Sequence, residues 1–150
     1  MALSITDLAI WLQEETAWQA TPEPISHLDY KHMIVRGLKR LFIDTGRASE
    51  YDQSLLDAGA EGWTYNRNFL IDEEEYIILC AQIVFFKRVQ SDVNNILGYS
   101  TDALTVTNSD KPYANLRNTI DELEKRRREL YYRMPRYTLE YEVSDTVSEG

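Results

Sequence analysis

The chain has 150 residues, 43% of them apolar and 27% charged, with a mean hydropathy of -0.45, which excludes a disordered segment and fits one domain with its own core. The formal net charge of -9 disfavours broad nucleic-acid binding, and the single cysteine, Cys80, excludes an internal disulfide and a multi-cysteine metal site. The longest apolar stretch, residues 76–86, is shorter than the roughly 20 residues that span a bilayer, and residues 1–7 lack a signal-peptide pattern. We therefore expect a protein of the cytoplasm or of a virion, with no membrane partner.

Two amphipathic helices are expected in the first third of the chain. Residues 5–17 carry apolar side chains at helical spacing, and Ser4 or Thr6 can cap the first turn. Ser26 is expected to cap the second helix in an acidic capping box with Asp29, and Gly46 is expected to end it. The apolar stripe of the second helix is Leu28, Ile34, Val35, Leu38, Leu41 and Phe42.

The segment after the second helix is predicted to be a surface loop followed by a short strand. Residues 47–62 are rich in polar and small side chains, and residues 54–58 favour one short helical turn. Large and polar side chains then alternate over residues 63–69, which is typical of a strand or an ordered extended segment.

The third helix is expected to be long and mostly buried. Asp72 is the predicted N-cap, and the helix should run to Leu97 and end at Gly98. Residues 76–86 are apolar on nearly all sides, so they should form the centre of a core or of a packed ring. Cys80 is expected there as a small buried hydrophobe.

No catalytic, cofactor-binding or metal-binding group is predicted. Glu73, Glu74 and Glu75 are expected to form a solvated first turn that suits the helix dipole, because consecutive helical side chains point about 100° apart and cannot converge on one ion. His27 and His32 are five residues apart, which does not place two imidazoles on one helical face. Phosphate-binding glycine loops and nucleophile elbows have no matching motif.

The fourth helix is predicted to pair with the third in a long antiparallel hairpin. Residues 99–112 are expected to be a linker with a β-like piece at 104–107, and the helix should run from Pro112 to Met134, before Pro135. Arg127 falls on the apolar seam of this helix, whose residues repeat at spacings of three, four and seven. The seam residues are Leu116, Ile120, Leu123, Leu130 and Met134.

A basic cluster on the fourth helix is predicted to form a charged lateral face. It consists of Lys125, Arg126, Arg127 and Arg128. Residues 111–136 hold eight basic and four acidic residues, a net of +4 that leaves -13 for the rest of the chain. Three interpretations stay open: a solvated face with salt bridges, a docking patch for an acidic protein, or contact with nucleic acid.

The C-terminal segment, residues 136–150, is predicted to be an extended tail. Residues 136–143 alternate between polar and apolar, so they can add as a strand to a sheet on another chain or fold back onto residues 63–69. The candidate partner-binding residues are Arg136, Tyr137, Leu139, Tyr141 and Val143. The expected fold is mostly α: a small helical bundle built on a long antiparallel helix hairpin, with one or two short β segments and an extended C-terminal arm.

The order of these elements resembles a known family. The segment FLIDEEEYI at 69–77 leads the long apolar helix, SDVN follows at 91–94, ALTV at 103–106, and YANLR at 113–117 opens the charged last helix. This pattern resembles the head–tail connector, or adaptor, proteins of tailed bacteriophages, best over residues 70–134.

The resemblance implies a structural protein and no enzyme. Residues 1–135 would be a helical connector domain, and copies of it would form a ring, usually of about twelve, below the portal in the phage neck. The ring would extend the channel through which DNA passes as cargo, and would contact the portal protein and the next neck or tail-completion protein. Family members dock on the portal through a C-terminal extension, the position that residues 136–150 hold here. The alternative is a small nucleic-acid-binding regulatory protein that uses the basic fourth helix.

Overall fold

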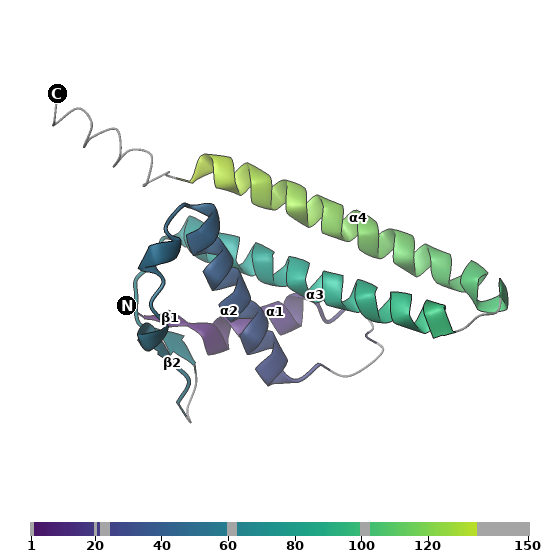
Figure 1. Cartoon of the computed structure of the whole chain (residues 1–150), viewed down its shortest axis with the longest axis horizontal. Helices are drawn as coiled ribbons and strands as arrows, with labels where there is room; N and C mark the ends of the chain where they lie inside the picture. Colours follow the sequence, from purple (N-terminus) through teal and green to yellow (C-terminus); the bar gives the residue numbers. More distant parts are fainter. Residues whose placement is uncertain (1, 20, 22–24, 60–62, 100–102, 135–150) are drawn as a thin grey trace.

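The computed structural model describes residues 2–19, 21, 25–59, 63–99 and 103–134, and it describes side chains outside residues 93–114. Four helices and a three-stranded antiparallel sheet are present in this part of the chain (Figure 1), so the predicted mostly α fold with short β segments is confirmed. The helices are α1 (Ile5–Glu15), α2 (His27–Asp44), α3 (Ile71–Tyr99) and α4 (Ala103–Arg133). The strands are β1 (Leu3–Ser4), β2 (Leu56–Asp57) and β3 (Thr64–Tyr65), and two short 3-10 helices lie at Ala48–Glu50 and Gln53–Leu55.

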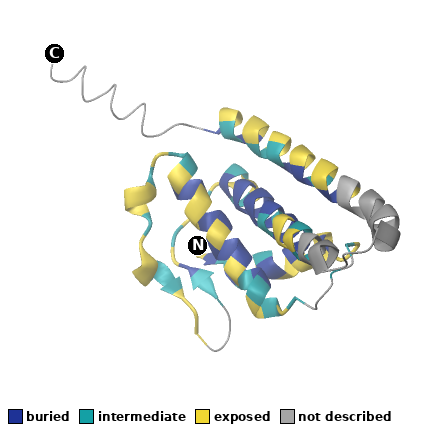
Figure 2. Ribbon diagram, turned by 45° about the vertical axis from the view of Figure 1, so that its right-hand side comes forward, coloured by how far each residue is buried: buried dark blue, intermediate teal, exposed yellow. Residues whose placement is uncertain are grey.

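Helix α3 is the centre of the fold, as the apolar run at 76–86 predicts. α2 and α4 both pack on α3, and α1 packs mainly on α2. In Figure 2 the ribbon of α3 is dark blue over much of its first half, and Ile77, Ala81 and Phe85 are fully buried. α2 crosses α3 at Gly37, where a Cβ atom would lie 2.4 Å from the carbonyl oxygen of Ile77. Only glycine permits this close backbone approach.

The local signals that begin and end the first two helices are confirmed. The Ser4 hydroxyl accepts a hydrogen bond from the backbone N–H of Asp7 at 3.2 Å, and α1 ends at Glu15, two residues earlier than predicted. Ser26 and Asp29 form the capping box at the start of α2. Gly46 follows the end of α2 with a φ of 75°, a conformation that glycine adopts at little cost.

Two predictions about the long helices are wrong. α3 begins at Ile71, so Asp72 lies inside its first turn and is not the N-cap, and α3 continues through Gly98 to Tyr99. α4 begins at Ala103, so residues 104–107 are helical and Pro112 lies well inside the helix. Both errors come from reading local propensity, which is a weak preference that the surrounding structure overrides.

The α3–α4 hairpin is confirmed, and so is the predicted apolar seam. Leu116, Ile120, Leu123, Leu130 and Met134 are all buried. Ion pairs join Lys87 to Glu124 at 3.1 Å and Asp72 to Arg133 at 4.0 Å. The earlier residue of α3 pairs with the later residue of α4, which is the order expected for antiparallel helices. In α2 the predicted stripe is buried except for Leu28, whose exposed fraction is 51%.

The small sheet joins the N-terminus to the segment before α3. β3 is the central strand: Tyr65 pairs with Leu3 of β1 on one side and with Leu56 of β2 on the other. Both edges of β3 are therefore occupied, and Thr64 and Tyr65 offer no strand edge to residues 136–143. The predicted arm itself, residues 136–150, lies outside the described residues.

Candidate functional site

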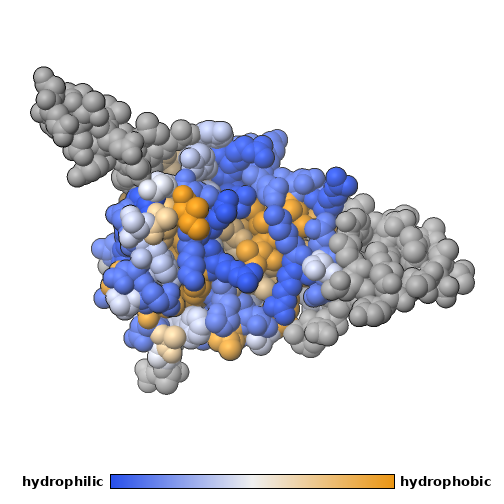
Figure 3. Space-filling model, in the orientation of Figure 1, coloured by the Kyte–Doolittle hydropathy of each residue, from blue (hydrophilic) through white to orange (hydrophobic). Residues whose placement is uncertain are grey.

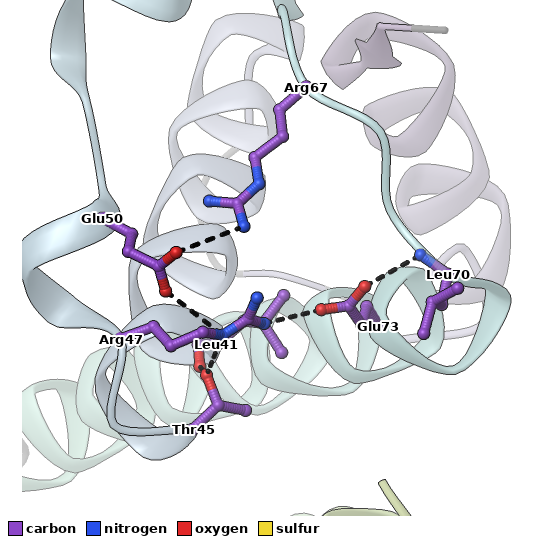
Figure 4. A network of polar contacts seen from close by, with 7 residues as sticks. All are labelled: Leu41, Thr45, Arg47, Glu50, Arg67, Leu70 and Glu73. Carbon is purple, nitrogen blue, oxygen red and sulfur yellow. Dashed lines mark hydrogen bonds and ion pairs between the residues drawn. The ribbon is translucent and has the colours of Figure 1, made fainter. Parts of the chain in front are cut away.

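A buried ion pair corrects the prediction of a solvated first turn in α3. The Glu73 side chain is only 9% exposed, and its carboxylate accepts a hydrogen bond from the Arg47 guanidinium at 2.7 Å. The other carboxylate oxygen accepts the backbone N–H of Leu70 at 2.9 Å (Figure 4). Arg47 also lies 3.8 Å from Glu50, which lies 3.9 Å from Arg67. The network fastens the loop after α2 to the start of α3.

The acidic first turn offers no cation site of the usual kind. Both carboxylate oxygens of Glu73 already have donors, and among the described residues no group of three or more His, Cys, Asp or Glu is placed to hold a metal ion. The first turn of α3 is therefore a structural support.

A polar cluster lies where α2, α3 and α4 meet. The Arg127 guanidinium faces the Cys80 thiol, and the Tyr76 hydroxyl donates a hydrogen bond to the Asp44 carboxylate. Arg40 pairs with the same carboxylate at 3.0 Å. The predicted place of Arg127 on the apolar seam is thus confirmed, and the seam is interrupted there by buried or half-buried polar groups.

The electrostatics of this cluster keep the thiol protonated. Burial raises the pKa of Cys80 from its ordinary value of 9.0 to about 11, although the facing Arg127 charge acts in the opposite direction. Burial, followed by the hydrogen bond to Asp44, raises the pKa of Tyr76 as well. Because the thiolate is the reactive form of cysteine, a thiol that is 2% exposed and neutral is a packing residue and no nucleophile.

The predicted charged lateral face is divided in two. Lys125, Arg126 and Arg128 are exposed, and Arg126 pairs with Glu122 at 3.0 Å, four residues earlier. Arg127 turns inward to the seam instead. The three exposed side chains surround part of α4 and do not form one flat basic patch.

A second basic surface escaped the sequence analysis. It is a groove of about 650 Å³ between α2 and α3, with Met33 and Val84 among its apolar lining. The basic lining residues are His32, Arg36, Lys87 and Arg88, and the acidic one is Asp29. His32 and Arg36 are four residues apart on one helix, but only the pairing of α2 with α3 brings Lys87 and Arg88 beside them. The spacing of four residues between His32 and Arg36, which places them on one face of α2, was the one signal in the sequence for this groove.

Large apolar side chains are exposed at several places on the described surface. Trp11 is 42% exposed and borders a groove of about 400 Å³ between α1, α3 and α4, in which Ile78 and Leu130 are buried. Elsewhere Trp18 is 64% exposed and Ile71 is 82% exposed. Figure 3 shows apolar side chains gathered in the middle of one face between hydrophilic bands. Such patches are typical of surfaces that contact other proteins.

Comparisons with family models, curated proteins and solved structures find no match. None of the described helices combines the length and the apolar character that crossing a membrane requires. The candidate partner-binding residues Arg136, Tyr137, Leu139, Tyr141 and Val143 lie outside the described part of the chain.

Proposed function

We propose that this chain is a structural head–tail connector that forms a ring below the portal in a phage neck and extends the DNA channel. The observation that carries the proposal is the exposure of large apolar side chains on a helical fold with a strongly unequal distribution of charge. Trp18, Ile71 and Tyr132 are 64%, 82% and 66% exposed, and they lie in the turn after α1, at the start of α3 and near the end of α4. Two different patches on one subunit suit a head-to-tail contact between copies, and such contacts close into a ring when the rotation between copies allows it.

The long hairpin gives further support. α4 packs chiefly on α3, so its outer face, with Lys125 and Arg128 exposed, remains accessible to a neighbouring protein. The element order that resembles the connector family supplies the identity of the partners: copies of this chain, the portal protein, and the next neck or tail-completion protein. Residues 136–150 are proposed as the arm that reaches the portal or a neighbouring subunit.

Association of the full chain tests this proposal. We expect light scattering and electron microscopy of the purified chain, alone and mixed with portal protein, to reveal rings or a portal complex. A chain that stays monomeric at all concentrations and does not bind portal contradicts the proposal.

The alternative, a nucleic-acid-binding regulator, rests on the exposed members of the basic cluster of α4, Lys125, Arg126 and Arg128. It predicts DNA binding that weakens steeply with salt and is lost in the double variant Arg126→Glu, Arg128→Glu. A flat DNA titration at low salt removes this alternative, and it leaves the connector proposal intact because DNA there is cargo only.

A further inference from the structure

The basic groove between α2 and α3 has the character of a peptide-binding surface. Its lining combines apolar Met33 and Val84 with the long side chains of Arg36, Lys87 and Arg88, all three exposed. With Asp29 as the one acidic lining residue, the groove carries a net charge of about +2 at neutral pH, on a chain whose total is -9. A segment that alternates acidic and apolar residues would complement both properties.

The chain contains such a segment at its C-terminus. Residues 137–150 hold four acidic residues and no basic one, and Leu139, Glu140, Tyr141, Glu142 and Val143 alternate strictly. In an extended segment, alternate side chains point to opposite faces, and side chains on one face repeat every 6.5 Å or so. Apolar side chains can then face Val84, since Met33 beneath it is only 3% exposed. Arg36 and Lys87 at the rim can reach over to the carboxylates, and Arg88 pairs with Asp29 at 3.7 Å.

We propose that the acidic tail, residues 137–150, of one copy docks in the basic groove of the neighbouring copy, an inference that rests on the ring formation proposed above. The occupant is thus a second copy of this chain, recognised by opposite charge and by alternating apolar side chains. The contact joins one patch to a different patch, as ring closure requires.

The position of the end of α4 favours a neighbouring copy over the same chain. Arg133, at the last turn of α4, lies 4.0 Å from Asp72 at the start of α3. The groove lies at residues 84–88 of α3, about 18 Å further along that helix at 1.5 Å per residue. α4 runs towards the start of α3, away from the groove, so the tail of the same chain must reverse its direction to enter it.

Charge reversal with rescue tests the contact. Arg36→Glu in the groove, and Glu140→Lys with Glu142→Lys in the tail, should each weaken self-association by at least about tenfold, because each places like charges together. The chain that carries all three changes should associate within about threefold of the wild type. The matched control is Lys39→Glu, the same charge change at an exposed position of α2 that does not line the groove, and it should have little effect.

Disulfide capture distinguishes the two origins of the tail. One preparation carries Arg36→Cys and a second, isotopically labelled one carries Glu142→Cys; after mixing and mild oxidation, we expect a labelled–unlabelled disulfide dimer. Absence of this dimer overturns the proposal. A third preparation carries both changes in one chain, and a disulfide that forms only within such single chains overturns the proposal as well.

The outcome also separates this contact from the proposed function. Rings that form equally well in the charge-reversed tail variant overturn the groove contact alone and leave the connector proposal standing. A wild-type chain that neither self-associates nor binds portal overturns both.

Discussion

Removal of the Glu73 carboxylate should destabilise the fold far more than removal of its neighbours. Glu73→Ala leaves the Arg47 guanidinium, whose side chain is 11% exposed, without the carboxylate at 2.7 Å, and leaves the Leu70 N–H without its acceptor. Breaking a buried pair from one side costs about 3–5 kcal/mol. Arg47 keeps a weaker partner in Glu50 at 3.8 Å, so we expect a loss near 3 kcal/mol, at the lower end of that range.

Thermal unfolding followed by circular dichroism measures this loss. For a chain of this length, about 3 kcal/mol corresponds to a fall in Tm of about 6–12 °C. The control is Glu75→Ala, the same chemical change two residues later at an exposed position, which should cost at most about 1 kcal/mol. A double-mutant cycle with Arg47→Met should give a coupling energy of about 2 kcal/mol. Equal losses for the two alanine variants, or a coupling energy near zero, would refute the assignment of Glu73 as a buried support.

Three further predictions concern the helix contacts. Gly37→Ala should lower the free energy of unfolding in urea by about 1–3 kcal/mol, because the new Cβ would lie 2.4 Å from the Ile77 carbonyl oxygen. This loss outweighs the gain of about 1 kcal/mol in helix propensity. An unchanged urea midpoint would contradict the close crossing of α2 and α3. Cys80 should resist thiol reagents at pH 8 in the folded chain and react on unfolding. Because its pKa is raised from 9.0 to about 11 in the folded chain, its contribution to the free energy of unfolding is complete below pH 9, and about 2–3 kcal/mol of that free energy is lost as pH rises through 11. Urea unfolding across that pH range measures the loss, and rapid labelling of Cys80 in the folded chain at pH 8 would contradict its burial. Arg127→Met should destabilise by about 1–3 kcal/mol and raise the pKa of the Cys80 thiol further, whereas Arg128→Met at an exposed site should do neither; equal effects of the two variants contradict the inward position of Arg127.

The sequence was sufficient where the deciding interaction is local. The Ser26 cap needs only Asp29 three residues later, and Gly46 needs only a left-handed conformation at the end of a helix. The seam of α4 was likewise predictable, because its spacing follows from helical geometry, and Arg127 falls within that spacing.

Non-local contacts account for what the sequence analysis missed. Two contacts separate Glu73 from Glu74 and Glu75: the Leu70 N–H, three residues earlier, and the Arg47 guanidinium, 26 residues earlier. The first depends on where α3 begins, and the second is non-local. The basic groove depends in the same way on the pairing of α2 with α3, since neither helix alone carries a compact basic cluster.

The position of Arg127 also bears on how α4 finds one alignment along α3. A seam of leucine and isoleucine at repeating intervals would remain apolar if α4 slid by one helical turn, so apolar packing alone does not select among such alignments. A slide would carry Arg127 away from Cys80 and Tyr76 and bring an apolar side chain against the Tyr76–Asp44 pair, leaving a half-buried charge without its partners. We infer that this single polar interruption sets the register of α4 on α3, because a register shifted by one turn costs the contacts of Arg127. The register in turn fixes the position of the charged outer side chains of α4 relative to the rest of the subunit.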